Sequence, residues 1–127
     1  MENGNYFTIN NLVVYQLARE YSQHGWKIYE PLTWQQRKII GDQMITSIDS
    51  VGANIAEGYG RFHYLDKIKF YYNARGSLIE SNHWIELLRE RGVITQDDFI
   101  KASNLYREIL LKLNLLIKSQ FNQKSNT

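Results

Sequence analysis

The chain has 127 residues, of which 43% are hydrophobic and 22% are charged, and its formal net charge is +2. This length suits one domain with a buried core, so we expect residues 1–127 to form a single domain. The absence of cysteine excludes disulfides and thiolate sites, and no apolar run approaches the roughly 18 residues that cross a bilayer. We therefore expect a cytoplasmic protein with no membrane partner.

Helical periodicity runs through nearly the whole chain. Apolar residues spaced by threes and fours predict four helices, over about residues 10–29, 34–58, 63–91 and 96–121. The connections between them are only a few residues long, which forces sequential helices to lie antiparallel. The predicted fold is therefore all-α, an antiparallel up-and-down four-helix bundle.

Start and stop signals mark the ends of these helices. Thr33 to Gln36 is typical of a capping box at the start of the second helix. The segment from Gly58 to Gly60 is expected to end that helix with a left-handed glycine. Gly92 closes the third helix, and Thr95 with the two aspartates after Gln96 is expected to open the fourth.

Two helices show clear core stripes. On the second, the predicted buried residues are Ile45, Ile48, Gly52, Ile55 and Tyr59, flanked by Met44, Val51 and Ala56. On the third, they are Tyr71, Ala74, Leu78, Ser81, Ile85 and Leu88. These spacings place each set on one helical face.

The apolar surface is wider than one bundle needs, since a core-facing helix requires only about three apolar residues in seven. The residues in excess lie on the third and fourth helices, and they are Tyr64, Ile68, Tyr72, Ile79, Leu111 and Leu115. A wide stripe inside a thick bundle is one explanation. We favour the other, that these residues contact further copies of the chain, because large exposed apolar patches are uncommon on monomers.

A polar stripe also runs along the second helix, through Ser47, Ser50, Asn54, Glu57 and Arg61 at helical spacing. On the third helix, Arg75 projects beside the apolar row, so its guanidinium is expected to have a partner. Glu57 and Glu80 are the candidates, and such a pair would fix the register of the helices more than it would add stability. The alternative is that this cluster contacts a ligand or nucleic acid.

No catalytic site, metal site or cofactor is indicated. The histidines, His24, His63 and His83, are far apart in the sequence and lack metal-ligand spacing. The segment from Gly58 to Gly60 is no dinucleotide fingerprint, because no strand precedes it and a third glycine is missing. We therefore expect a protein that is not an enzyme.

Two segments carry a family resemblance. Asn54-Ile-Ala-Glu-Gly-Tyr-Gly-Arg61 and Phe70-Tyr-Tyr-Asn-Ala-Arg-Gly-Ser-Leu-Ile-Glu80 occur in that order. They strongly resemble bacterial four-helix-bundle proteins encoded within intervening sequences of large-subunit ribosomal RNA genes, which are sometimes labelled ribosomal proteins. The resemblance covers about Leu12 to Lys118, and that family also looks related to the accessory variability determinant of diversity-generating retroelements.

This resemblance implies a bundle that assembles into a ring, in known relatives a homopentamer, with no known enzymatic activity. The retroelement relatives are strongly basic and are thought to bind nucleic acid and a reverse transcriptase. This chain has Ile45 and Thr46 where many relatives have a basic pair, and Gly52 where proline is frequent. The loss of the basic pair weakens the expectation of nucleic-acid binding.

Three functions remain as hypotheses. We favour a non-enzymatic, ring-forming scaffold whose partner is the chain itself. The alternative is a nucleic-acid-binding accessory protein that acts through the basic surface of the oligomer, with the candidate contacts Arg61, Lys67, Lys69, Lys112 and Lys118. An enzyme or small-ligand binder using Asn54, Glu57 and Arg75 is the least favoured.

Overall fold

The computed structural model describes residues 8–124, which fold into helices with no strand among them. In chain order the elements are η2 (Ile9–Asn11), α1 (Val13–Tyr29), α2 (Trp34–Gln36), η3 (Arg37–Gly41), α3 (Asp42–Tyr59), α4 (Tyr64–Glu90) and α5 (Gln96–Lys124). The segments α2, η3 and α3 follow one another without a break and together form the second helix of the bundle.

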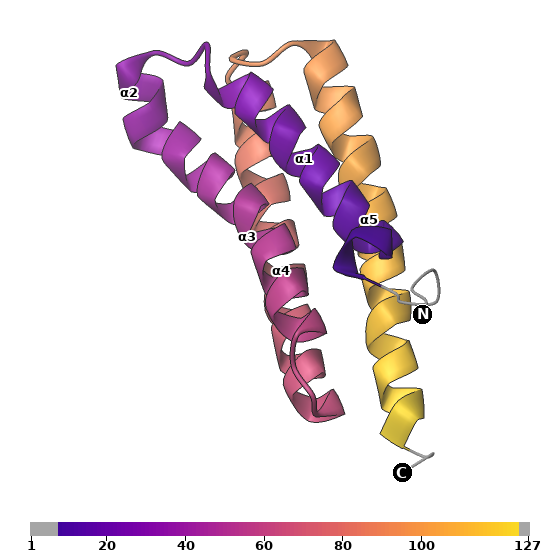
Figure 1. Ribbon diagram of the computed structural model, residues 1–127. Helices are drawn as coiled ribbons and strands as arrows, with labels where there is room; N and C mark the ends of the chain where they lie inside the picture. The colour runs from indigo at the N-terminus through magenta and orange to yellow at the C-terminus, as the bar shows by residue number, and fades with distance from the viewer. Residues whose placement is uncertain (1–7, 125–127) are drawn as a thin grey trace.

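The helices pack as an antiparallel four-helix bundle, which confirms the predicted fold class. Helix α1 contacts α3 and α5, and α4 contacts the same two helices from the other side of the bundle. The order around the bundle is therefore α1, α3, α4 and α5, and sequential helices run in opposite directions (Figure 1). This order decides which side chains can meet across each seam.

The second helix contains a π-helical turn that the sequence analysis did not predict. In this turn, η3, the backbone N–H of Asp42 bonds to the carbonyl oxygen of Arg37, five residues earlier. Gly41 allows the turn to approach the preceding loop, because a Cβ there would lie 2.7 Å from Leu32 Cδ1. The extra residue in this turn rotates the side chains of α3 about the helix axis relative to those of α2.

The core stripes follow the prediction closely on α4 and less closely on α3. All six predicted core residues of α4 are buried. On α3, Ile48 and Ile55 are buried as expected, whereas Ile45, Gly52 and Tyr59 are half-buried. The buried stripe there is rotated toward Met44, Ser47, Val51 and Gly58.

A polar contact lies inside this core. The hydroxyl groups of Tyr21 in α1 and Ser81 in α4 are 2.7 Å apart, and Ser81 donates to the carbonyl oxygen of Leu78 at 2.6 Å. Tyr21 therefore donates to Ser81, and the contact ties together two helices that face each other diagonally. Burial raises the pKa of the Tyr21 phenol well above its ordinary value, and burial also raises the pKa of Tyr71 to about 12.

The helix ends confirm three cap predictions and correct one. The capping box of Thr33 and Gln36 forms with bonds of 2.9 and 3.1 Å, and Thr95 Oγ1 accepts from the N–H of Asp98 at 3.1 Å. Gly92 has a φ of 68° and ends α4, as predicted. The left-handed glycine expected at the end of the second helix is not found, because Gly60 has a right-handed φ of −77°.

Gly58 serves a different purpose from the one predicted. It is buried within α3, and a Cβ added to it would lie 2.7 Å from Tyr71 Cε1 and 3.1 Å from Phe70 Cβ. The residue therefore lets α3 and α4 approach closely, because it has no side chain between the two helices.

Candidate functional site

The polar motif on α3 bonds mainly to its own helix. Asn54 Nδ2 donates to the carbonyl oxygen of Ser50 at 2.9 Å, and Ser50 Oγ donates to that of Thr46 at 2.8 Å. Glu57 and Arg61 form an ion pair one turn apart, at 2.8 Å and with both side chains about half exposed. Each of these contacts joins residues four apart, so the motif is a set of local contacts along one helix. The exposed ion pair contributes little to stability.

Arg75 has a different partner from those predicted. Its Nη1 donates to Oδ1 of Asn114 at 2.8 Å, and its guanidinium lies 4.7 Å from the centre of the Tyr72 ring. Arg75 therefore joins α4 to α5, away from the α3 motif.

The carboxylates expected beside Arg75 are occupied elsewhere. Glu57 pairs with Arg61 on α3, and Glu80 accepts a hydrogen bond from Trp84 Nε1 at 3.1 Å. The proposed cluster of Asn54, Glu57 and Arg75 is therefore wrong, because each of the three has separate contacts. The prediction failed because the sequence does not say which helix lies on which side of α4.

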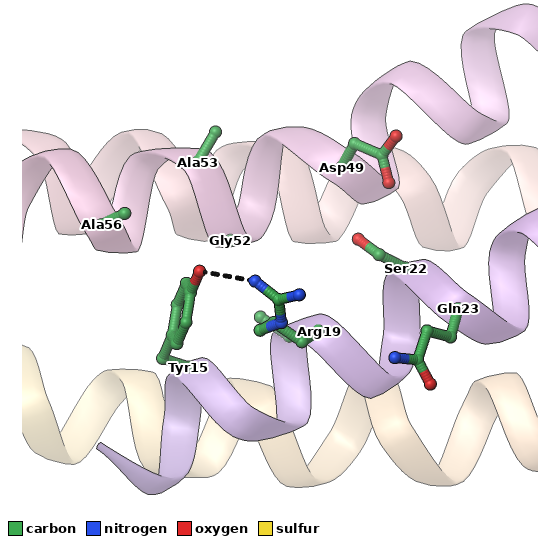
Figure 2. Close-up of a pocket in the computed structure, with 9 residues that line it drawn as sticks. Tyr15, Arg19, Ser22, Gln23, Asp49, Gly52, Ala53 and Ala56 are labelled. Atoms are coloured by element: carbon green, nitrogen blue, oxygen red, sulfur yellow. Dashed lines mark hydrogen bonds between the residues drawn. The ribbon is translucent and has the colours of Figure 1, made fainter. Parts of the chain in front are cut away.

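A shallow groove runs between α1 and α3 (Figure 2). It has a volume of about 310 Å³ and is lined by small residues of α3, including Gly52, Ala53 and Ala56, and by polar residues of α1. Arg19 Nη1 donates to the hydroxyl of Tyr15 at 3.1 Å, and both side chains project from α1, as Figure 2 shows. Neither Asn54 nor Arg75 lines this groove, so it does not bring the sequence motifs together.

Residues 8–124 were compared with the requirements of a metal site and of a membrane-spanning helix. Between residues 8 and 124, no group of three His, Cys, Asp or Glu side chains is arranged to hold a metal ion. The buried His24 places Nε2 2.9 Å from the carbonyl oxygen of Asp98, so that nitrogen carries the proton and ties α1 to the start of α5. Within the same described range, no helix is long and apolar enough to span a bilayer.

The predicted basic residues do not form one open patch. Lys67 Nζ donates to the carbonyl oxygens of Tyr59 at 2.8 Å and Gly58 at 3.4 Å, at the end of α3. Burial lowers the pKa of Lys67, and its ammonium serves there as a helix C-cap. Lys69 and Lys118 are exposed.

The other two cations are partly engaged. Arg61 pairs with Glu57 and lies 4.7 Å from the centre of the Phe70 ring. Lys112 is half-buried and lines a groove between the start of α1 and α5. Sequence reasoning missed Phe62, whose side chain is 94% exposed in the turn between α3 and α4.

The apolar row predicted on the outside of the bundle is largely present. Tyr72 and Ile79 on α4 are 40% and 52% exposed, and Leu111 and Leu115 on α5 are 61% and 57% exposed. The Arg75–Asn114 bond brings together the turns of α4 and α5 that carry Tyr72, Ile79 and Leu111, whereas Leu115 lines a groove between α5 and the start of α1. We call the surface defined by Tyr72, Ile79 and Leu111 the α4–α5 face.

Two residues of the predicted row lie elsewhere. Ile68 is only 5% exposed and belongs to the buried set of α4, so it cannot serve as an interface residue. At 3.6 residues per turn it falls about 40° nearer the core stripe than Tyr72 does. Tyr64 is half-buried, whereas its neighbour Leu65, which was not predicted, is exposed.

Comparison with known proteins supports the resemblance seen in the sequence. The family model for the 23S rRNA-intervening sequence protein matches residues 10–115. Among solved structures, the chain is similar to a protein of unknown function from the S23 ribosomal protein family of Bacteroides thetaiotaomicron, whose crystal structure has a resolution of 1.70 Å. The two chains share 28% identity with a TM-score of 0.78, over 84% of this chain and 96% of the other. No curated protein matches this chain.

Proposed function

Because the chain belongs to the 23S rRNA-intervening sequence protein family, we propose that it is a non-enzymatic scaffold that assembles with copies of itself. In this proposal five copies close into a homopentameric ring. The observation that carries it is the α4–α5 face, where three large apolar side chains are exposed on the turns that the Arg75–Asn114 bond joins. Burial of that face is the gain that favours assembly.

The energetics of the α4–α5 face favour contact with another protein surface. Fully burying an exposed Leu, Ile or Phe side chain contributes about 1.5–3 kcal/mol. The three side chains keep between 40% and 61% of their surface in contact with water, so a partner would gain about half of that contribution at each position. Apolar residues that cluster in this way are the usual anchors of protein interfaces.

A ring needs a second, different surface on each copy. Contacts that close around an axis of higher than twofold symmetry are head-to-tail, so the α4–α5 face of one copy must meet another part of the next. The α2–η3 segment offers such a surface, because the side chains of Trp34 and Ile39 are exposed on it.

Light scattering coupled to size-exclusion chromatography tests this proposal. The chain has a mass of 15.0 kDa, and we expect the species at micromolar concentration to have five times that mass. A clean monomer would contradict self-assembly. A discrete assembly of another size would leave the scaffold in place and refute the pentamer.

A second function is favoured by the turn between α3 and α4. Phe62 is almost fully exposed there, close in sequence to Arg61 and the exposed Lys69. An aromatic ring beside cations can stack on an unpaired base while the cations contact phosphates. Repetition of this turn around a ring would multiply the contacts, and phosphate attraction grows with their number.

Binding of a fluorescent single-stranded RNA across a salt series tests this second function. We expect affinity to fall steeply with salt and to weaken in Phe62→Ala and in Lys69→Ala. Glu20→Ala, an exposed change on α1, is the control. Absence of salt-dependent binding to the wild-type protein would remove this function and leave the scaffold untouched.

We also propose a cytoplasmic location. The chain has no cysteine, so it needs no oxidising compartment to form disulfides. Fractionation of cells that express the protein, followed by detection in the cytoplasmic or the membrane fraction, tests the location directly.

A further inference from the structure

A pocket opens at the end of the bundle where α4 begins and α5 ends. The two helices run antiparallel, so the first turns of α4 and the last turns of α5 lie at the same end of the molecule (Figure 1). The pocket has a volume of about 500 Å³ and is lined on one side by Phe62, His63, Tyr64 and Lys67 and on the other by Gln120 and Gln123. One side is therefore mainly aromatic, and the other carries side-chain amides.

The aromatic side presents an open ring face. Phe62 is 94% exposed, and the centre of its ring lies 5.8 Å from that of His63 with the ring planes at 87°. Two rings at this angle touch through the edge of one of them, so the contact covers at most one face of the Phe62 ring. The other face remains in water, and an open aromatic face is the feature on which unpaired bases stack.

The opposite side offers hydrogen-bonding groups. Gln120 and Gln123 are three residues apart on α5, so their side chains lie on one face of that helix. Each side-chain amide has two donors and an acceptor. Within residues 8–124 neither of these side-chain amides has a hydrogen-bond partner, so both are available to a ligand.

The lysine that lines the pocket is already engaged. Lys67 Nζ donates to the carbonyl oxygens of Tyr59 at 2.8 Å and Gly58 at 3.4 Å. Arg61, which precedes Phe62, pairs with Glu57 and does not line the pocket. The pocket therefore suits a neutral planar group with a polar edge better than it suits a phosphate.

We propose that this pocket holds one unpaired nucleobase, stacked on Phe62 and hydrogen-bonded through its edge to Gln120 and Gln123. The proposal rests on the second function above, the binding of a single strand, and names the part of the strand that the chain recognises. Adenine is the favoured base, because a glutamine amide can donate to its N7 and accept from its N6 amino group at once. The phosphates of the strand stay outside the pocket, near the exposed Lys69.

Other occupants satisfy this lining less well. A free phosphate needs a cation that is not already bonded, whereas Lys67 donates to two carbonyl oxygens. An apolar side chain of a protein partner could pack on Phe62, but it would bury the two amides without partners, which costs free energy. A base meets both demands, because it has a flat face for stacking and a polar edge.

Fluorescence anisotropy with three short labelled RNA strands, oligo(A), oligo(U) and oligo(C), tests the proposal at one low salt concentration. We expect the wild type to bind oligo(A) about fivefold or more tightly than the other two. Phe62→Ala should weaken binding of all three strands by about tenfold, because every base has a face that can stack. The double change Gln120→Ala and Gln123→Ala should instead lower the affinity for oligo(A) to that for oligo(U).

Gln96→Ala is the matched control, since it removes the same amide from the opposite end of α5. It should bind each strand as the wild type does, and circular dichroism should show the same helix content in every variant. If the wild type binds the three strands equally, or if the double variant keeps the preference for oligo(A), the pocket is refuted as the base site while single-strand binding stands. Unchanged binding by Phe62→Ala would refute the stacking. If no strand binds the wild type, the second function itself is refuted.

Discussion

On α3, Gly58 is closed in by the ring of Tyr71, whereas on α4 the space beside Gly76 is empty for at least 4 Å. Gly58 lies in the last turn of α3 and faces the bundle interior, whereas Gly76 lies near the middle of α4 and faces outward. The packing of the bundle requires the first glycine to lack a side chain and makes no such demand on the second.

The same contrast holds for the polar motif of α3 and the α4–α5 face. The most unusual part of the sequence, around Asn54, makes hydrogen bonds within its own helix. The less conspicuous apolar residues of α4 and α5 are the ones left in water. An unusual sequence motif therefore does not by itself identify the surface that contacts a partner.

The largest effect is expected from charge on the α4–α5 face. The double change Ile79→Glu and Leu111→Glu should raise the dissociation constant of the assembly by about a hundredfold or more, because burying unpaired carboxylates is costly. The unfolding free energy of the chain should change by no more than about 0.5 kcal/mol, since both sites are exposed. Sedimentation and urea denaturation measure the two quantities, and a variant that assembles like the wild type would count against the face.

A smaller effect is expected at Gly58. Gly58→Ala should lower the unfolding free energy by about 2 kcal/mol, because the added carbon would overlap the buried Tyr71 ring. Gly76→Ala, which makes the identical change in open space, is its control and should not destabilise the dissociated chain. Equal stabilities for the two variants would erase the contrast between the glycines.

The prediction of the fold from sequence succeeded where a helix is long and regular. The core stripe of α4 was predicted from periodicity alone, because residues three or four apart lie on the same side of a helix with 3.6 residues per turn. On α3, apolar residues occupy two adjacent arcs, and packing against α4 selected the arc with Met44 and Val51. The π turn in η3 left no readable signal in the sequence.

The site was predicted only in part, and for a different reason. The exposed positions of Tyr72, Ile79, Leu111 and Leu115 followed from an excess of apolar residues. The partner of Arg75 did not follow, because an arginine side chain can reach toward either neighbouring helix. The order of helices around the bundle, which brings Asn114 within 2.8 Å, is a property of the tertiary fold.

A loss of about 1 kcal/mol is expected from Tyr21→Phe. The change removes the hydroxyl that Tyr21 donates to Ser81 in the core and leaves an acceptor on Ser81 unsatisfied. Tyr15→Phe, which removes a hydroxyl bonded to the exposed Arg19, is the control and should have little effect. Chemical denaturation of the two variants measures the difference, and equal losses would show that the diagonal contact is unimportant.

The smallest effect is expected from alkaline pH. Burial raises the pKa of Tyr21 and of Tyr71 above the ordinary value of 10.0, the latter to about 12. Both phenols therefore bind their protons more tightly in the folded state, so their contribution is complete well below pH 10, begins to fall as pH approaches 10, and is lost as pH rises through the folded-state pKa. Unfolding free energy should fall by about 1 kcal/mol or less between roughly pH 8 and pH 10, and Tyr21→Phe should reduce this fall.

Hydroxyl-radical footprinting of the assembled and the diluted protein is the most direct test of the α4–α5 face as the meeting surface. Mass spectrometry reports the oxidation rate of each side chain. We expect Tyr72, Ile79 and Leu111 to be oxidised several times more slowly in the assembly than in the dissociated chain. Equal oxidation rates for these three side chains in an assembled sample would contradict the account, because copies would then meet through another surface.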